Sequence, residues 1–417
     1  MEQRENSELG PGFKMTELGP LPEDWSLIKL GDIADIKYGK AKPKTRGSIP
    51  VIGSGGVYDH TNISLVDFPT IIIGRKGKAG FAWLAEEPSW PSDTTFYLDW
   101  RRQLDIQYIF HYLTLKPLSG EYAKTTLPSI QKPDLENYMI PFPPLDEQPK
   151  IAYVLNAIQR GIGKTGKVID AARELKKSLM RHLFTYGPVP YDQVDNVPLK
   201  ETEIGPVPEY WYVGRIEELV EFTRKPRNLK LSGDQIPFIP MELIPSGSEF
   251  NTGYISKRAE EIKSGVYCEN GDILLAKITP SFENGKQGIV DIPTNYAYAT
   301  TEVYPLKAQP DKLDRMYLFC YLKVSKVRED IAGKMEGTTG RQRVPKAVVE
   351  NYRVPLPPLP EQQEIAHILQ TVDRKIEAEE NRKRALEALF KTLLHYLMTG
   401  KIRVKGLIGS QGINSRL

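Results

Sequence analysis

The sequence predicts a mixed α/β fold in which one unit, a globular domain followed by a long helix, occurs twice in tandem. Two pairs of similar segments support this prediction. Segment 17–25 reads ELGPLPEDW and segment 203–211 reads EIGPVPEYW, with six of nine positions identical. Segments 136–155 and 350–369 share twelve of twenty positions. The offset between the copies grows from 186 to 214 residues, so the second globular part is 28 residues longer.

The composition indicates a soluble globular protein of two to four domains. A length of 417 residues exceeds one ordinary domain, and 40% hydrophobic with 26% charged residues allows sizeable cores. No apolar run is long enough to span a bilayer, and segment 1–10 lacks a signal-peptide core. We therefore expect a cytoplasmic protein without membrane contact. Two cysteines and five scattered histidines provide neither a disulfide framework nor metal-ligand spacing.

Each globular part contains short β-rich runs, separated by turns and followed by a helix. In the first part the runs are 49–52, 70–73 and 94–98, with a helix at 106–115. In the second part they are 236–239, 272–275 and 301–304, with a helix near 313–324. These signals predict α/β domains at 1–145 and 201–359, followed by helical regions at 146–200 and 360–417.

A proline-rich segment ends each globular part, and a helix of about forty residues follows, or roughly 60 Å at 1.5 Å per residue. Apolar residues in each helix recur at alternating spacings of three and four, which is typical of a coiled-coil seam. This apolar seam comprises Ile151, Leu155, Ile158, Ile162, Ile169, Ala172, Leu179 and Leu183 in the first helix, and Ile365, Leu369, Val372, Ile376, Leu386, Phe390, Leu393 and Leu397 in the second. It is interrupted by Thr165 and Lys176 in the first helix and by Glu379 and Lys383 in the second. So narrow a seam requires a partner helix, and the other copy is the obvious one.

Three glycines interrupt the first helix at Gly161, Gly163 and Gly166. Each costs about 1 kcal/mol relative to alanine inside a helix. We expect a kink or a frayed turn there, because the seam resumes at Ile169. Either simple tolerance in a packed bundle or a functional hinge would account for the glycines.

The duplicated arrangement resembles the specificity subunit of type I restriction–modification systems. The resemblance rests on the two entry segments at 17–25 and 203–211 and on the exits PPLDEQ and PPLPEQQ, each leading into a long helix. It implies two target-recognition domains that each read half of an asymmetric, bipartite double-stranded DNA sequence, separated by two antiparallel helices. It also implies two methyltransferase subunits and restriction subunits as partners. S-adenosylmethionine, ATP and Mg²⁺ are then expected on those partners, with no cofactor in this chain.

The sequence offers no convincing catalytic motif. Segment 161–165 (GIGKT) approaches a phosphate-binding loop, but Ile158 stands where the first glycine is required and no strand precedes it. An Asn-Pro-Pro-aromatic motif for adenine methylation is absent. We therefore expect a non-catalytic recognition subunit. The alternatives are a stand-alone sequence-specific DNA-binding regulator and a recognition chain with its own methylase or nuclease activity.

The candidate DNA contacts are cations and polar side chains in loops. Arg75, Lys76 and Lys78 lie on a glycine-rich loop after a β run, where backbone can approach phosphate and arginine can read guanine. A solvated basic turn is the alternative interpretation. The corresponding loop of the second domain offers Lys277, Thr279 and Lys286. The remaining candidates are Lys42, Lys44, Arg46, Ser129 and Gln131 in the first domain, and Arg224, Lys225, Arg227, Arg341, Gln342 and Arg343 in the second.

Overall fold

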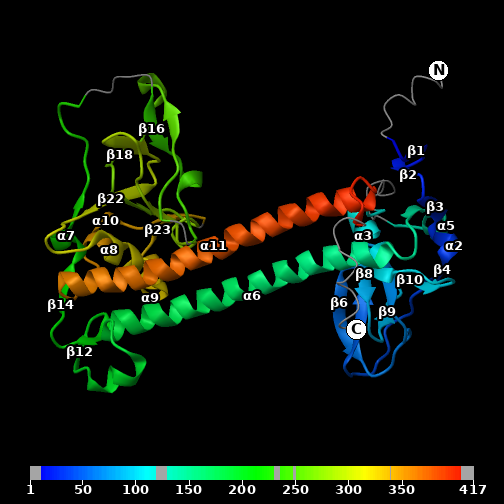
Figure 1. The fold of residues 1–417 in the computed structure, drawn as a ribbon. Coiled ribbons are helices and arrows are strands. Elements are labelled where there is room, and N and C mark those ends of the chain that lie inside the picture. The colour runs from blue at the N-terminus through cyan, green and yellow to red at the C-terminus, as the bar shows by residue number, and fades with distance from the viewer. Residues whose placement is uncertain (1–10, 119–128, 230–234, 248–249, 339, 405–417) are drawn as a thin grey trace. The chain divides into compact units, whose positions relative to one another are not determined.

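The computed structural model describes residues 11–118, 129–229, 235–247, 250–338 and 340–404 (Figure 1). The chain forms two compact units. Unit 1 joins the residues up to Lys164 to those from Lys383 onward, and unit 2 runs from Thr165 to Arg382. Each unit therefore contains one globular domain and one half of each long helix. No helix among the described residues is both long and apolar enough to cross a membrane.

The globular part of unit 1 is built on two small sheets. The first has the order β4-β10-β7-β8, and its middle strand β7 is buried along its whole length because Ile71, Ile72 and Ile73 favour extended backbone and a packed surface. The second has the order β6-β5-β9. The elements are β1 (Phe13–Thr16), β2 (Gly19–Pro22), β3 (Ser26–Lys29), α2 (Leu30–Ile33), β4 (Ala34–Tyr38), β5 (Ile49–Gly53), β6 (Gly56–Thr61), β7 (Thr70–Gly74), β8 (Ala82–Ala85), β9 (Trp90–Pro91), β10 (Thr95–Trp100), α3 (Ile106–Leu115), α5 (Lys132–Glu136) and β11 (Met139–Phe142).

Unit 2 repeats this plan with longer connections. Its two four-stranded sheets have the orders β15-β22-β19-β20 and β17-β16-β21-β18. More than half of the 28 additional residues lie between β16 and β19. The elements are η1 (Tyr191–Asn196), β12 (Leu199–Thr202), β13 (Gly205–Pro208), β14 (Tyr212–Arg215), α7 (Ile216–Leu219), β15 (Val220–Phe222), β16 (Ile236–Ile239), η2 (Met241–Leu243), β17 (Ile255–Lys257), η3 (Ala259–Glu261), β18 (Val266–Glu269), β19 (Ile273–Ala276), β20 (Gln287–Ile289), β21 (Tyr296–Ala299), β22 (Val303–Ala308), α8 (Arg315–Tyr321), α9 (Ser325–Ala332), β23 (Glu336–Thr338), β24 (Arg341–Arg343), α10 (Lys346–Glu350) and β25 (Arg353–Leu356).

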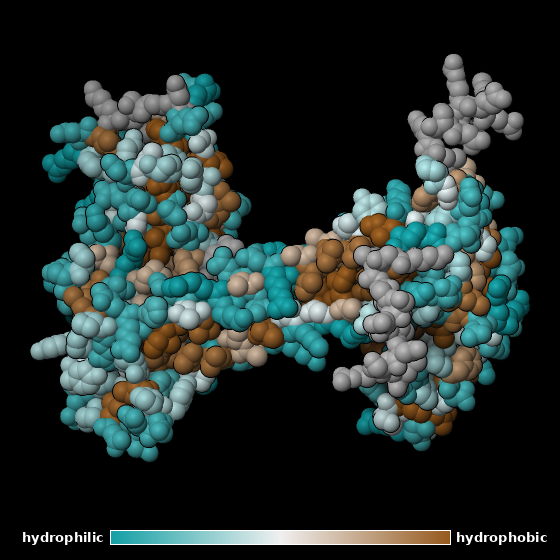
Figure 2. Space-filling model, in the orientation of Figure 1, coloured by the Kyte–Doolittle hydropathy of each residue, from teal (hydrophilic) through white to brown (hydrophobic). Residues whose placement is uncertain are grey.

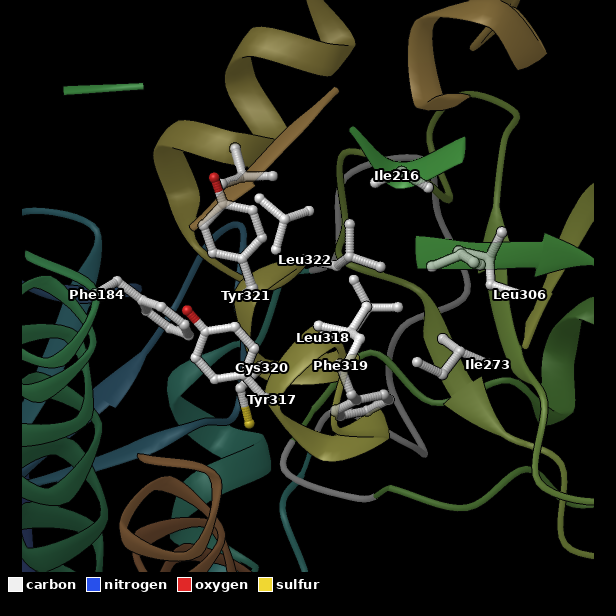
Figure 3. Close-up of a cluster of buried hydrophobic side chains, with 14 of the residues drawn as sticks. Phe184, Ile216, Ile273, Leu306, Tyr317, Leu318, Phe319, Cys320, Tyr321 and Leu322 are labelled. Carbon is white, nitrogen blue, oxygen red and sulfur yellow. The ribbon is translucent and has the colours of Figure 1, made fainter. Parts of the chain in front are cut away.

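The core of unit 2 joins the sheet to the long helices through α8. Figure 3 shows Tyr317, Leu318 and Tyr321 of α8 in this core, with Phe184 of a long helix against them. The Phe184 ring centroid lies 5.3 Å from those of Tyr317 and Tyr321. Because these rings are almost fully buried, they fasten the globular domain to the helix.

The long helices are α6 (Gln148–Tyr186) and α11 (Leu359–Met398), and their halves pair antiparallel within each unit. In unit 2, Arg173 contacts Glu380 and Lys176 contacts Asp373, so the residue numbers run in opposite directions. The buried seam residues include Ile151, Leu155, Leu183, Ile365, Leu369, Ile376 and Leu397. Others are half-buried, namely Ile158, Leu179, Val372, Leu386 and Leu393. The predicted architecture of two α/β domains and two antiparallel helices is therefore confirmed.

The predicted frayed turn at the glycines is wrong. Helix α6 continues without a break through Gly161, Gly163 and Gly166. The hydrogen bonds of a long helix and the packing of the seam on both sides outweigh the local propensity cost.

Replacing Gly163 by alanine is expected to stabilise unit 1 by about 1 kcal/mol, because a methyl group lowers the entropy of the unfolded chain. A Cβ atom at this exposed position would meet no atom within 4 Å. Thermal unfolding of the variant measures the effect. Gly161→Ala is the companion variant, since its Cβ would lie 3.7 Å from Leu386 Cδ1, an ordinary contact distance. A lower melting temperature for Gly163→Ala would indicate that the helix requires this glycine.

The retained Glu-Gln pair forms the same joint between domain and helix in both units. Gln148 accepts a hydrogen bond from the Asp105 backbone N (3.0 Å) and donates one to the Pro143 carbonyl (3.1 Å). Gln362 does the same with Asp314 N (2.8 Å) and the Pro357 carbonyl (2.9 Å). Both glutamines are buried, so these bonds satisfy polar groups that would otherwise be costly.

The preceding glutamate of each joint binds the tryptophan of the entry segment. Trp25 Nε1 donates to Glu147 (3.2 Å), and Trp211 Nε1 donates to Glu361 (3.1 Å). The two segments that revealed the duplication are thus in direct contact in each unit. This contact explains physically why both segments stayed alike while the sequence between them diverged.

Candidate nucleic-acid interface

In unit 1 the basic loop after β7 lies against the segment that leads to α5. Ile130 N donates a hydrogen bond to the Arg75 carbonyl (3.0 Å), and Lys76 forms a β-bridge with Ser129. Lys76, Lys78 and Gln131 are exposed. The structure therefore gathers five of the sequence candidates, Arg75, Lys76, Lys78, Ser129 and Gln131, from two separate segments.

Neighbouring groups hold the Arg75 side chain in place. Its Nη2 donates to the Asp93 carbonyl (2.9 Å), and its guanidinium lies 5.4 Å from the centroid of the Tyr38 ring. The turn between β5 and β6 adjoins this loop, because Ser54 N donates to Thr94 Oγ1 (3.4 Å). The sequence reasoning missed Tyr38 and this turn. The Gly-Ser-Gly-Gly run at 53–56 was the available signal for a turn, and nothing in the sequence linked it to Arg75.

The candidates before β5 lie in a different setting. Lys42, Lys44 and Arg46 are exposed, and Lys42 forms an ion pair with Asp59 of β6. Thr45 bonds Thr61 through their hydroxyl groups (2.8 Å), which fixes this segment along β6. The contacts of Lys42 and Thr45 thus connect this segment to β6.

In unit 2 the loop after β19 is joined to β24 and the following residue by three hydrogen bonds that involve backbone groups. Thr279 N donates to the Gln342 carbonyl (3.0 Å), and Gln342 N donates back to Thr279 Oγ1 (3.0 Å). Val344 N donates to the Lys277 carbonyl (2.8 Å). The candidates Lys277, Thr279, Arg341, Gln342 and Arg343 therefore form one surface, although more than sixty residues separate the two segments.

Charge on this surface is arranged around Glu302. Arg343 donates to both Glu302 oxygens, from Nε (2.9 Å) and from Nη2 (2.7 Å). The Arg343 contact holds the pKa of the Glu302 carboxyl below its usual range. Lys277 Nζ lies 4.9 Å from the Tyr304 ring centroid, and partial burial lowers the pKa of its ammonium.

Two other groups of unit 2 candidates lie elsewhere. Lys286 Nζ donates to the Met241 carbonyl (2.7 Å), so this partly buried side chain holds the loop to η2. Arg224, Lys225 and Arg227 follow β15 and are exposed. Loop sequence alone gave no sign that the ammonium of Lys286 would bind a carbonyl within its own domain.

The two surfaces share one backbone framework but differ in their side chains. Arg75 and Lys277 occupy equivalent positions in the two units. The carbonyl of Arg75 accepts a hydrogen bond from Ile130 N, and the carbonyl of Lys277 accepts one from Val344 N. The backbone N–H of Arg75 donates to the Thr94 carbonyl, and that of Lys277 donates to the Glu302 carbonyl. The equivalent β-bridges pair Lys76 with Ser129 and Ile278 with Arg343. One framework therefore presents a different set of hydrogen-bonding groups in each unit.

The described residues contain no group of three or more His, Cys, Asp or Glu side chains placed to hold a metal ion. Both cysteines are buried and free. Burial raises the pKa of the Cys320 thiol to about 12 and also raises that of Cys268. Neither thiol is therefore activated as a nucleophile, since nucleophilic cysteines have lowered pKa values.

A family model described as the type I restriction modification DNA specificity domain matches residues 22–170 and 208–388. These two matches take in most of both globular domains and more than half of each long helix. The chain belongs to this family. Within it, the chain is similar to the type I restriction enzyme MjaVIII specificity subunit of Methanocaldococcus jannaschii, with 27% identity over 412 residues, covering 93% of this chain and 95% of the relative.

Solved structures of the family share the fold. The type I restriction–modification S subunit from M. genitalium matches with a TM-score of 0.63 at 17% identity, covering 93% of this chain and 99% of that one. A chain from a structure on complex assembly and conformational transition of the type I system matches with a TM-score of 0.52 at 14% identity, covering 92% and 99%. At these identities the similarity concerns the fold of a specificity subunit.

Proposed function

We propose that this chain is the DNA sequence-specificity subunit of a type I restriction–modification complex and that each globular domain reads one half of a bipartite, asymmetric target. The supporting observation is the shared framework of the two candidate surfaces. It carries Arg75 and Ser129 in unit 1, and Lys277 and Arg343 in unit 2. Equivalent backbone placement with different donors suits two half-sites of different sequence.

The long helices and their joints serve as the scaffold for partner subunits in this proposal. Figure 2 shows hydrophobic side chains at the surface of both helices. Exposed apolar residues include Tyr153, Val168 and Leu175 of α6, and Leu389 and Tyr396 of α11. Contiguous apolar patches on a protein surface mark contacts with another protein, and in this proposal the apolar surface of these helices has that role. The proposed partners are two methyltransferase subunits, followed by restriction subunits.

Catalysis belongs to those partners in this proposal, and the chain itself has no catalytic role. S-adenosylmethionine, ATP and Mg²⁺ then bind the partner subunits. The high pKa of the Cys320 thiol agrees with a recognition role and argues against cysteine chemistry.

Co-expression with a type I methyltransferase subunit tests the proposal directly. We expect the two chains to co-purify and to methylate DNA at one bipartite sequence only when both are present. Each chain expressed alone is the control. A stable pair that methylates no DNA would contradict the proposed function.

Replacing Arg75 by alanine is expected to relax one half of the target and leave the other half intact. The variant removes donors that Asp93 and Tyr38 hold in place on the unit 1 surface. Mapping of methylated sites gives the sequence preference of each half. Lys37→Ala is the matched control, since it removes an equal charge on β4, where Lys37 forms an ion pair with Asp99 of β10. Equal loss of preference in both halves would contradict the division of labour.

Inserting seven residues into each long helix, at paired positions, is expected to lengthen the unread spacer by about three base pairs. Seven residues add about 10 Å of helix, and one base pair spans about 3.4 Å. Seven residues preserve the coiled-coil spacing, so the seam remains continuous. An insertion of equal size in segment 187–198, outside the helices, is the control. Methylation mapping that found the original spacer would refute the role of helix length.

A further inference from the structure

Arg343 and Glu302 form a hydrogen-bonded ion pair on the unit 2 surface. This pair bears on base recognition, an inference that rests on the proposed function. Glu302 accepts hydrogen bonds from Nε and from Nη2 of Arg343. An arginine side chain has five N–H donors in a fixed plane. The pair uses one donor on Nε and one on Nη2, so the edge formed by Nη1 and the second hydrogen of Nη2 keeps three donors.

The backbone beneath Arg343 is equally well defined. Arg343 pairs with Ile278 in a β-bridge, and the neighbouring Gln342 and Val344 bond the Thr279 and Lys277 backbone. Tyr304 also donates its hydroxyl to the Val344 carbonyl (2.8 Å). The side chain of Arg343 remains 48% exposed while that of Glu302 is 24% exposed. The backbone of Arg343 is thus held by β24, and the edge of its guanidinium formed by Nε and Nη2 is held by Glu302. The half-exposed side chain leaves the edge formed by Nη1 and Nη2 for a ligand.

We propose that Arg343, oriented by Glu302, reads a guanine in the half-site bound by unit 2. Guanine presents O6 and N7 as two acceptors in the major groove, and the end of an arginine guanidinium matches that pair. A held arginine loses less conformational entropy on binding than a free one. Glu302 is the positioning residue, because its contacts act through Arg343. Its negative charge disfavours nearby phosphate, so the pair favours base readout over backbone contact.

Arg341 provides a contrast on the same strand. It lies two residues earlier in β24, so it occupies the same face as Arg343, and it is exposed. Its expected role is phosphate contact, which adds affinity without sequence preference. At the framework positions of Arg343 and Glu302, unit 1 carries Ser129 and Thr94, which cannot form such an ion pair. This Arg–Glu pair, and the guanine contact assigned to it, therefore belong to the half-site bound by unit 2.

Selection from a random duplex library tests the assignment, using the full-length chain in complex with the methyltransferase subunit that co-purifies with it. The wild-type complex is expected to select a guanine in the half-site that Arg75→Ala leaves intact. Arg343→Lys keeps the charge but loses the planar pair of donors. We expect it to lower the preference for that guanine by roughly ten- to hundredfold while other positions stay unchanged.

Two further variants separate base readout from charge and from folding. Glu302→Gln removes a negative charge near DNA, so overall affinity should hold or rise while the guanine preference at the same position falls. Arg341→Ala should weaken binding to all sequences and reduce the dependence of log affinity on log salt by about one. Melting temperatures of all variants report whether unit 2 stays folded.

The outcomes distinguish this inference from the proposed function. If the wild-type complex selects a bipartite motif and Arg343→Lys leaves every position of it unchanged, the guanine assignment is wrong and the proposed function stands. If Glu302→Gln changes affinity but not the preference, Glu302 does not orient Arg343. A wild-type complex that selects no motif would overturn both the function and the inference.

Discussion

Replacing Lys176 by methionine is expected to lower the free energy of unfolding of unit 2 by roughly 3 kcal/mol, the cost of leaving a buried charge unpaired. Lys176 interrupts the seam of α6, and its Nζ lies 2.7 Å from Oδ1 of Asp373 on α11. The Asp373 side chain is only 2% exposed. Lys323 lies nearby, and burial together with the charge of Lys176 lowers its pKa to about 8. The methionine variant leaves the buried Asp373 carboxylate without its direct ion-pair partner, and loss of the Lys176 charge removes one cause of the lowered Lys323 pKa.

Native-state hydrogen exchange in segments of unit 2 measures this effect separately from unit 1. Arg173→Met is the matched control, because Arg173 also bridges the helices, to Glu380, but its side chain is 55% exposed. An exposed pair contributes at most about 1 kcal/mol. The double variant Lys176→Met with Asp373→Leu should recover most of the loss, since an apolar pair replaces the buried ions. A double variant as unstable as the single one would contradict this explanation.

Replacing Arg403 by glutamine is expected to destabilise unit 1 by about 3 kcal/mol and to leave unit 2 unaffected. Arg403 follows α11 and donates to both carboxylate oxygens of Glu147, at 2.8 and 2.7 Å. It also donates to Asp24, at 2.8 and 2.7 Å. The Glu147 side chain is 1% exposed, so loss of Arg403 strands a buried negative charge.

Unit 2 lacks this requirement because its equivalent glutamate has neutral partners. Glu361 accepts hydrogen bonds from the Tyr210 hydroxyl (3.0 Å) and from the Trp211 indole. Burial raises the pKa of the Glu361 carboxyl. Adding Glu147→Gln to Arg403→Gln should restore much of the stability of unit 1, as measured by exchange in its segments. Asp24→Asn should cost less, since Asp24 is 44% exposed. Equal destabilisation of both units by Arg403→Gln would contradict the conclusion that Arg403 stabilises unit 1 through Glu147.

The repeated architecture was predictable because its signals are local and periodic. Matching segments at 136–155 and 350–369 located both helix entries, and the three–four spacing predicted the seam. The glycine run misled this reasoning, since α6 is continuous through Gly163. Local propensity gives way where a helix is held by packing along its length.

The candidate interface was predictable only in part. Loop composition pointed to Arg75 and to Arg343, but it did not show that Arg343 is held by Glu302, forty-one residues earlier in the chain. That pairing depends on the tertiary contact that brings Glu302, just before β22, against Arg343 of β24. The Glu-Gln joint was visible as a repeated motif, while its bonds to Trp25 and Asp105 required the tertiary structure.

Unit 1 is formed by two separate segments of the chain, one before and one after unit 2. This arrangement constrains the order in which the protein folds during synthesis. Unit 2 is contiguous from Thr165 to Arg382, so it is complete before the last residues are translated. The core of unit 1 joins Ile151 and Leu155 to Leu397 and Val404. The first half of α6 must therefore keep an apolar face uncovered while more than two hundred residues emerge from the ribosome. Unit 2 is thus expected to complete its folding before unit 1, although the first segment of unit 1 is translated before it.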